Sequence, residues 1–288
     1  MKGRVLVFAA AFVLFPVATG FAQAGQRGQR GRPAAGPVPR QPDGQVSLGP
    51  LPGELGVWLP GAGGAERLVD PEPGDPLDAQ FPIPAAARFP GKLNIREVPF
   101  QPWAKELHSY RRENQLEPHT RCKPSGGPRQ FLTPYGVEFV INREAQRVFI
   151  FDIGGPHTFR TIYMDGRPHP KDIVPSYYGH STGHWEGDTL VVDTIGFNEN
   201  FWLDRYGFPH TEKLHLIERI TRTDSITMKY EVTIDDPGAY TAPWNSGFFL
   251  FWDPGQELFE YVCQENNFAS DLMIGAQESV DRSSRIVP

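Results

Sequence analysis

The sequence predicts a mainly β protein, built as an antiparallel meander or up-and-down β-barrel with one N-terminal helix. Three observations favour this class. Beyond Cys122 the chain divides into short runs rich in β-branched and aromatic residues, most of them joined by connections of hairpin length. Parallel strands need crossovers of a dozen or more residues, and most of the connections are shorter than that. The globular pattern begins near Trp103, which leaves about 185 residues, enough for one core.

The helix is predicted at residues 104–114, where Leu107, Tyr110 and Arg111 recur at helical spacing. The predicted strands follow at residues 136–142, 147–153, 157–164, 177–185, 189–195, 214–221, 226–234, 247–252 and 257–264. Strands joined in this way are expected to curl and close, because closure removes the unpaired edges of a sheet.

One register can be derived from alternation. In the strand at 226–234 the even-numbered residues are apolar, and the preceding strand repeats this pattern except at Glu218. A three-residue loop between the two strands would pair Glu218 with Tyr230, whereas a two-residue loop would pair apolar with polar residues. Glu218 is therefore predicted to face inward. It is either an acid or base tuned by desolvation, or half of a structural ion pair with Arg219 or Arg222.

The hairpin at residues 179–194 carries the densest polar pattern. A two-residue turn centred on either Glu186-Gly187 or Gly187-Asp188 would bring six side chains to one face, since strand side chains alternate. These residues are His180, Thr182, His184, Val191, Asp193 and Ile195. A turn centred on Glu186-Gly187 would set His180 directly opposite Asp193.

A histidine paired with a carboxylate is suited to proton transfer near neutral pH, so His180, Asp193 and Glu218 are the candidate catalytic residues. The alternative is a polar, outward-facing hairpin surface, because the opposite face of the hairpin is the more apolar one. Candidate ligand-binding residues are Tyr178, Thr182, Trp202, His210 and Tyr230. Two of these lie in the long connection at 196–213, which is either a lid over a site or an aromatic plug for a barrel end.

No metal or cofactor is expected. His180 and His184 lie four residues apart, about 13 Å along a strand, so one ion could not bind both unless a bulge at Gly183 intervened. No phosphate loop or dinucleotide fingerprint is present. Ser176 and Ser181 lack the strand, sharp turn and helix that expose a hydrolase nucleophile.

The N-terminus predicts export to the periplasm or beyond. Residues 1–24 are typical of a signal peptide, with Lys2 and Arg4 before an apolar run and small residues before Gly25. The alternative is a retained anchor, although the apolar run falls short of the ~20 residues that span a bilayer. No membrane insertion is expected after cleavage.

The rest of the chain divides by composition. Residues 25–64 are rich in Gly, Pro and Arg and are predicted to form a disordered tether, residues 65–102 an extended Pro-rich segment, and residues 103–288 the β domain. The tether is basic although the chain carries a net charge of −6. It could touch an anionic lipid or polymer, but a solvated linker fits as well. No nucleic-acid partner is expected, and the partner predicted is a small-molecule ligand or substrate.

Cys122 and Cys263 are the only two cysteines. In an oxidising compartment such a pair is expected to form a disulfide, which would join the segment before the barrel to the last predicted strand. The alternative is two buried thiols.

Four motifs resemble a widespread family of secreted bacterial proteins. They are IYMDGRPHP at 162–170, GHSTGHWEGDTLVVDTIGFN at 179–198, TIDDPGAY at 233–240 and EYVCQEN at 260–266. The resemblance implies export but no defined activity. In that family the position of His184 is commonly arginine, which favours His180 with Asp193 as the working pair. The barrel also resembles lipocalin-like proteins by analogy of architecture, which does not fix function.

Two classes of function follow. An enzyme, either an isomerase, a lyase or a hydrolase, would use His180, Asp193 and Glu218 to transfer protons on a small organic or carbohydrate-derived molecule. A non-catalytic small-molecule-binding or envelope-interaction protein would use the same barrel without chemistry. The aromatic content of 12% is compatible with a pocket in either class.

Overall fold

The computed structural model describes residues 34–61, 67–75, 88–152, 158–259 and 263. The predicted signal peptide and the first part of the predicted tether lie outside these residues. Among the described residues, no helix has the length and apolar character needed to cross a membrane.

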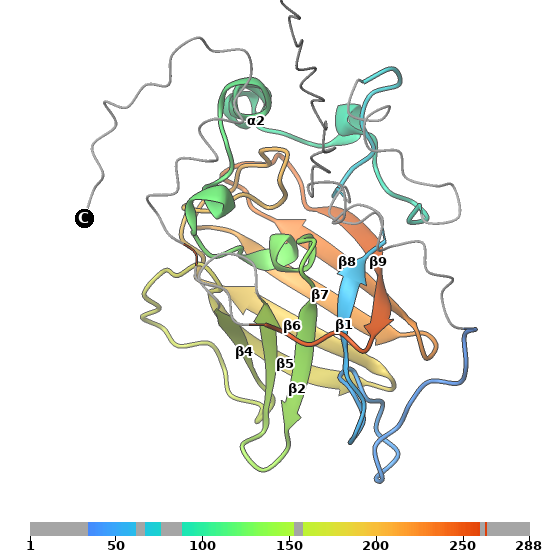
Figure 1. Cartoon of the computed structure of the whole chain (residues 1–288). Helices are drawn as coiled ribbons and strands as arrows, with labels where there is room; N and C mark the ends of the chain where they lie inside the picture. The colour runs from blue at the N-terminus through green and yellow to red at the C-terminus, as the bar shows by residue number, and fades with distance from the viewer. Residues whose placement is uncertain (1–33, 62–66, 76–87, 153–157, 260–262, 264–288) are drawn as a thin grey trace, which may run out of the picture. The chain divides into compact units, whose positions relative to one another are not determined.

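Nine strands form a closed barrel in which each strand pairs with the next and the last pairs with the first (Figure 1). They are β1 (Gly56–Pro60), β2 (Val137–Asn142), β3 (Arg147–Asp152), β4 (Phe159–Tyr163), β5 (His180–Glu186), β6 (Thr189–Ile195), β7 (His215–Arg222), β8 (Thr227–Asp235) and β9 (Trp244–Pro254). The mainly β class and the closed barrel are confirmed.

The barrel is mixed, so the antiparallel meander is wrong at one point. β4 and β5 pair in parallel, with Ile162 beside Ser181 and Tyr163 beside Thr182. The connection at 164–179 runs back along the sheet before β5 begins, and a chain that returns to the same end must start a parallel strand. This crossover is one of the long connections between the predicted strands.

The ninth strand is not the one predicted. β1 pairs with β9 over five residues and meets β2 where Trp58 lies beside Val137. β1 lies in the segment that was predicted to be a disordered tether. That prediction missed the strand because its short apolar run lies among prolines. Of the strand expected at 257–264, the first three residues are not in a strand, and the rest lies outside the described residues apart from Cys263.

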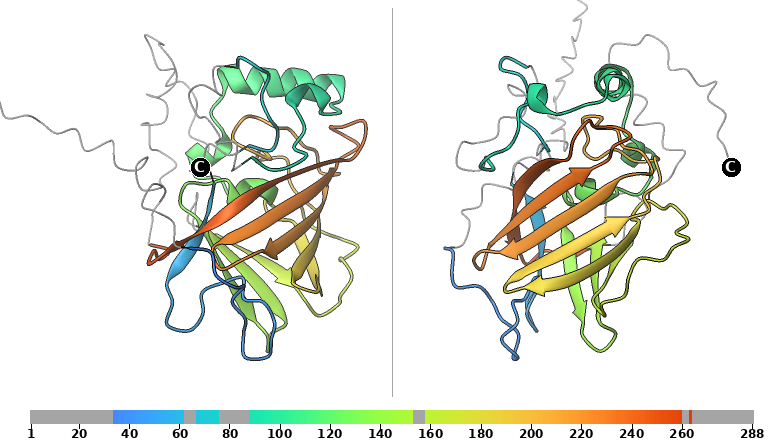
Figure 2. Two further views of the ribbon diagram at one scale, coloured as in Figure 1. Left: turned by 90° about the vertical axis from the view of Figure 1, so that its right-hand side faces the viewer. Right: turned by 180° about the vertical axis from the view of Figure 1, so that it is seen from behind.

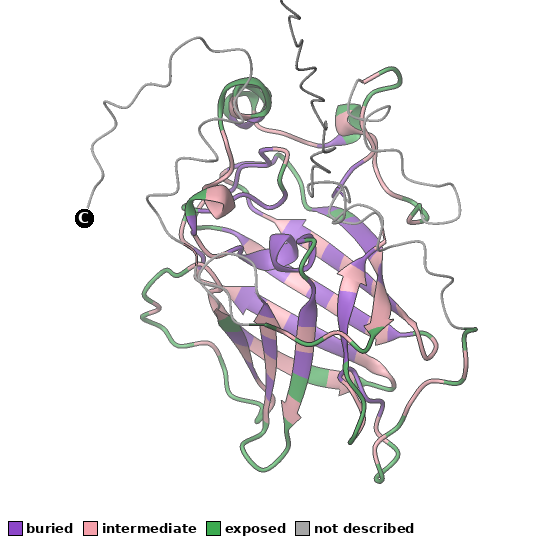
Figure 3. Cartoon of the chain, viewed as in Figure 1, coloured by how far each residue is buried: buried purple, intermediate pink, exposed green. Residues whose placement is uncertain are grey.

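Buried residues alternate with more exposed ones along the strands, as the colouring of Figure 3 shows. In β7 and β8 every even-numbered residue is buried, as predicted. A short 3-10 helix, η5 (Gly127–Phe131), is buried throughout, and its Phe131 ring contacts the rings of Phe139, Tyr230 and Phe248 on β2, β8 and β9. The interior is thus packed with side chains in the manner of a protein core.

The helix α2 (Pro102–Asn114) confirms the helix predicted at 104–114. Proline at its first position suits the start of a helix, because that residue needs no backbone donor. Its buried His108 packs between the rings of Phe100 and Phe208. Two more 3-10 helices, η3 (Ile95–Glu97) and η4 (Pro118–Arg121), flank α2 in the chain.

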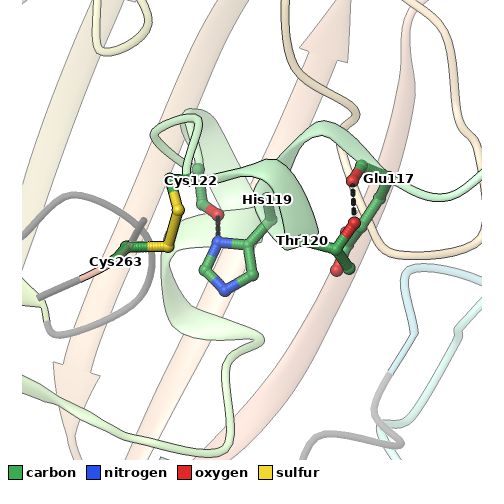
Figure 4. Close-up of a disulfide and its surroundings, with 6 residues drawn as sticks. Glu117, His119, Thr120, Cys122 and Cys263 are labelled. Atoms are coloured by element: carbon green, nitrogen blue, oxygen red, sulfur yellow. Dashed lines mark hydrogen bonds between the residues drawn. A yellow bond between two sulfur atoms is a disulfide. The ribbon is translucent and has the colours of Figure 1, made fainter. Parts of the chain in front are cut away.

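Cys122 and Cys263 form a disulfide, as predicted, with their Cα atoms 5.6 Å apart (Figure 4). Cys122 follows η4 in a left-handed conformation, and His119 lies beside the disulfide with its Nδ1 2.8 Å from Ser125 Oγ. The crosslink joins residues 141 positions apart. A loop of that length restricts the unfolded chain strongly.

Replacing both cysteines, as Cys122→Ser with Cys263→Ser, is expected to lower the free energy of unfolding by roughly 3–5 kcal/mol, since the unfolded chain regains its freedom. Urea unfolding of the oxidised protein and the variant measures the difference. Intact mass of denatured protein alkylated without reductant is the control. Immediate labelling of both cysteines, or equal stability of the two proteins, would contradict the expectation.

Candidate functional site

The hairpin between β5 and β6 turns at Gly187-Asp188, with Gly187 in the left-handed region at φ +61°. Thr182 therefore lies opposite Asp193, and His180 lies opposite Ile195. The direct pairing of His180 with Asp193 is wrong, because it required the other turn. Both side chains still share one face, as the parity predicted.

That face is the outer surface of the barrel. The alternate residues of the same strands, such as Ser181 and Thr194, are buried inside, while His180 and Asp193 are half-buried. The face of the hairpin that carries His180 and Asp193 therefore points outward, as the alternative prediction held.

His169 connects His180 to Asp193. It lies in the crossover between β4 and β5, and its Nδ1 is 2.8 Å from His180 Nδ1 while its Nε2 is 3.1 Å from Asp193 Oδ1. The same carboxylate oxygen lies 2.9 Å from Nε2 of His215, at the start of β7. We refer to His169, His180, Asp193 and His215 as the imidazole cluster.

These contacts restrict where protons can lie. Two Nδ1 atoms at hydrogen-bond distance need one proton between them, so one ring donates and the other accepts. The Nε2 atoms of His169 and His215 face a carboxylate oxygen, so both are donors when Asp193 is ionised. His169 thus connects the imidazole of His180 to the carboxylate of Asp193.

The cluster remains open to solvent. The side chain of Asp193 is 43% exposed, that of His215 38% and that of His169 19%. Burial lowers the pKa of His180 below its usual value, and the charges of His169 and Arg167 lower it further. These effects favour the neutral form of the His180 ring, which is the form that can accept a proton.

An aromatic and cationic wall borders the cluster. The ring of Tyr163 stacks on His180 at 5.1 Å and 19°. The guanidinium groups of Arg167 and Arg147 lie 4.2 Å and 5.3 Å from the Tyr163 ring centroid. This stack fixes the plane of the His180 ring, so the orientation of the ring does not depend on a ligand.

Glu218 does not belong to the imidazole cluster. It is fully buried inside the barrel, on the other face of the sheet, and Arg160 on β4 forms a bidentate ion pair with it. Tyr230 donates to Glu218 Oε1 at 2.8 Å, although Glu218 pairs across strands with Val232 and not with Tyr230. The register differs by two residues because the loop between β7 and β8 is longer than predicted.

The buried pair is fully hydrogen-bonded. Arg160 also donates to Thr194 Oγ1 at 2.6 Å and to Ser181 Oγ at 3.0 Å. The alternative of a structural ion pair for Glu218 is therefore supported, with Arg160 in place of Arg219 or Arg222. Satisfying every polar atom is what makes a charged pair tolerable in a core.

Glu218→Gln is expected to lower the free energy of unfolding by about 3–5 kcal/mol, because it leaves the Arg160 guanidinium buried without a counter-charge. Arg160→Met with Glu218→Leu removes both charges and should recover much of that loss. Urea unfolding at neutral pH compares the three proteins. Lys229→Gln breaks an exposed ion pair with Glu231 and serves as the control. Equal stability of Glu218→Gln and wild type would contradict the structural role.

A second buried polar group lies at the end of β3. Tyr178 donates to Asp152 Oδ2 at 3.0 Å, and the Gln130 amide donates to the same oxygen at 2.8 Å. Burial raises the pKa of Asp152 to about 7, against the hydrogen bonds from Gln130 and Tyr178, which lower it. Burial also raises the pKa of Tyr178 well above its usual range. Tyr178 is thus part of a buried network and not of the outer face.

Because of the Asp152 carboxyl, the free energy of unfolding should fall as pH rises. The folded protein keeps a proton on this carboxyl that the unfolded chain releases, so the stability it contributes is lost between the unfolded pKa of 3.8 and the folded pKa of about 7. The loss is at most on the order of 4 kcal/mol. Asp152→Asn should flatten the fall in unfolding free energy between pH 5 and pH 8. Asp165→Asn, at an exposed carboxyl, should leave the wild-type slope, and an unchanged slope in Asp152→Asn would contradict the assignment.

Three other predicted ligand-binding residues are buried. Trp202 packs under the guanidinium of Arg111 at 5.1 Å. His210 places its Nε2 3.0 Å from the Phe201 carbonyl oxygen, and burial lowers its pKa to about 4. Both fit the aromatic plug predicted as one alternative for this connection. Tyr230 lies inside the barrel beside Glu218, so only Thr182 of the five predicted residues faces outward beside Asp193.

Within the described part of the chain, no group of three or more His, Cys, Asp or Glu side chains is arranged to hold a metal ion. Comparison of the chain with protein-family models, with curated proteins and with solved structures finds no match. The geometry of the imidazole cluster therefore carries the functional interpretation.

Proposed function

We propose that this protein is an exported enzyme that transfers protons on a small organic or carbohydrate-derived molecule at the imidazole cluster. The observation that supports this is the contact chain from His180 Nδ1 to His169 Nδ1, at 2.8 Å, and from His169 Nε2 to Asp193, at 3.1 Å. A neutral imidazole connected in this way to a carboxylate can take up a proton and pass on the charge.

The proton step can be written in full. His180, carrying its proton on Nδ1, accepts a substrate proton on Nε2 and releases the Nδ1 proton to His169 Nδ1. His169 then carries two protons and one positive charge, and its Nε2–H donates to Asp193. The charge therefore moves to the ring that lies against the carboxylate, while His180 returns to a neutral state. Return of the proton along the same path to a different atom of the substrate completes an isomerisation, and its delivery to a departing hydroxyl or alkoxide group completes an elimination. Activation of a water by His180 begins a hydrolysis.

His215 supports the carboxylate in this scheme. Its Nε2–H donates to the same Asp193 oxygen that accepts from His169, so the Asp193 side chain is held in place from two sides. Asp193 is thus a positioning residue that acts through His169. Glu218 has no role in the chemistry proposed, because it lies on the other side of the sheet.

Export itself belongs to this proposal, as does membership of the secreted family that the four motifs resemble. The signal peptide pattern supports a periplasmic or secreted location. The disulfide is compatible with such a location, because disulfides persist in oxidising compartments.

The second candidate function is non-catalytic binding of a small molecule or an envelope component. The exposure of Asp193 and His215 favours this reading, since open polar surfaces also serve in recognition. Carriage of a ligand inside the barrel, as the lipocalin analogy would suggest, is less well supported because the interior is filled by Phe131, Tyr230 and the Arg160–Glu218 pair.

Asp193→Asn should lower the pKa of His180 and reduce turnover by about 10²-fold or more, the usual contribution of a positioned acid–base group. Histidine NMR titration of the free protein measures the first effect before any substrate is known. Turnover is sought as deuterium exchange into a panel of sugars, sugar acids and hydroxy ketones in heavy water, or as hydrolysis of their esters.

His184→Arg is the matched control, because His184 shares the face and its polar contact is with Glu186, at 3.2 Å, outside the imidazole cluster. It should leave the titrations and turnover near wild type. An unchanged His180 titration in Asp193→Asn, or equal damage from His184→Arg, would show that the face is ordinary sheet surface.

A further inference from the structure

A groove of about 300 Å³ lies on the outer side of β7, β8 and β9. Residues 89–91 form one wall, and outward side chains of the three strands form the floor, chiefly Ile217, Arg219, Glu231, Thr233 and Asn245. The right-hand view of Figure 2 faces the outer side of these strands. The volume falls at the lower end of the range for small-molecule sites.

The wall exists because β9 carries a glycine. A Cβ at Gly247 would lie 2.4 Å from Cζ of Phe89, so any larger residue would displace the ring. The Phe89 ring also packs on Phe249, with centroids 5.4 Å apart, and Lys229 Nζ lies 5.8 Å from its centroid. These contacts hold an apolar wall over a strand face that would otherwise be flat.

The groove adjoins the imidazole cluster in register. Asp193 on β6 pairs with Ile217 on β7, Ile217 pairs with Thr233 on β8, and Thr233 pairs with Asn245 on β9. Side chains at paired positions point to the same face, so the cluster and the groove floor form one continuous row. Neighbouring strands are about 4.8 Å apart, which puts Thr233 about 10 Å from Asp193 along the row.

The groove chemistry is polar but balanced in charge. Arg219 donates to Glu186 at 2.8 Å, and Glu231 pairs with Lys229 at 2.6 Å, so each charge has a partner of its own. Thr233 Oγ1 donates to Asn245 Oδ1 at 2.7 Å, so the amide oxygen of Asn245 has a partner within the groove and its amide nitrogen is the group that can donate to a ligand. Ile217 and Phe89 supply apolar surface between these groups.

We propose that this groove is the substrate-binding subsite of the imidazole cluster and that it takes a neutral, ring-shaped polyol, such as a sugar or cyclitol. A ring of this kind has apolar C–H faces for Ile217 and Phe89 and a rim of hydroxyl groups for Asn245, Arg219 and Glu231. A charged ligand would have to compete with ion pairs that are already formed. The proposal rests on the proposed function for its chemistry, but binding in the groove can be measured by itself.

The test is NMR titration of ¹⁵N-labelled protein with neutral aldohexoses and with myo-inositol, with glucuronate and glucosamine as charged comparisons. We expect amide shifts centred on Ile217, Thr233 and Asn245, and tighter binding of at least one neutral ring than of either charged one. Asn245→Leu should weaken that binding about tenfold, the loss of one good hydrogen bond.

Asn114→Leu, at an exposed position of α2, is the matched control and should bind as wild type, and thermal unfolding checks that Asn245→Leu is folded. Absence of groove shifts with every neutral ring, preference for a charged ring, or unchanged binding in Asn245→Leu would each overturn the proposal. Groove binding without any effect of Asp193→Asn on histidine titration or turnover would uphold the groove as a binding site for neutral rings while refuting the proposed function.

Discussion

The buried pair of Arg160 and Glu218 is the constraint on which the rest of the structure depends. Closing nine strands into a barrel encloses a space that must be filled, and here a charged pair occupies it with exposures of 1% and 0%. The side chains that hydrogen-bond to the pair come from three different strands: Ser181 from β5, Thr194 from β6 and Tyr230 from β8. A slip of one residue in any of these strands would turn its polar group outward and leave the ion pair unsatisfied. The interior thus fixes the register of β4 to β8.

That register determines the outer face as well. Because the inward positions of β5 to β8 are fixed, the outward positions carry His180, Asp193, His215 and the groove floor in fixed rows. Because β4 and β5 pair in parallel, a long crossover connects them, and a hairpin could not provide it. This crossover carries His169, which contacts both His180 and Asp193. The packed interior leaves chemistry to the outside of the barrel. An open site of this kind suits a small substrate that approaches over the sheet surface.

Local pattern predicted a large part of this architecture. The helix at 104–114, eight of the nine strands, the inward face of Glu218 and the disulfide were all predictable, because they depend on alternation, helical spacing or cysteine count. The errors came where the outcome depends on contacts far apart in the sequence. The hairpin could turn at either of two places one residue apart, and the turn that forms makes Thr182, not His180, the cross-strand partner of Asp193. A loop longer than predicted makes Val232, not Tyr230, the cross-strand partner of Glu218.

The residues that the sequence analysis missed were missed for one common reason. His169 lies in a long connection with no periodicity, Arg160 lies in a short strand 58 positions from its partner, and β1 is an apolar run among prolines. Neither alternation nor helical spacing marks any of them, since each acquires its role only when the barrel closes. Two clues were available. His169 lies in the motif at 162–170, and His215 is an odd-numbered residue beside an even apolar face, and so faces outward like Asp193.

A crystallographic fragment screen tests most directly the claim that the chemistry belongs to the outer face. Crystals of the protein soaked with small hydroxylated and carbonyl-bearing fragments should show them between Tyr163 and Asn245, against His180, His169 or Thr233. Density inside the barrel, against Tyr230 and the Arg160–Glu218 pair, would contradict the account, because it would mean that the interior opens to ligands and that the outer cluster is only surface.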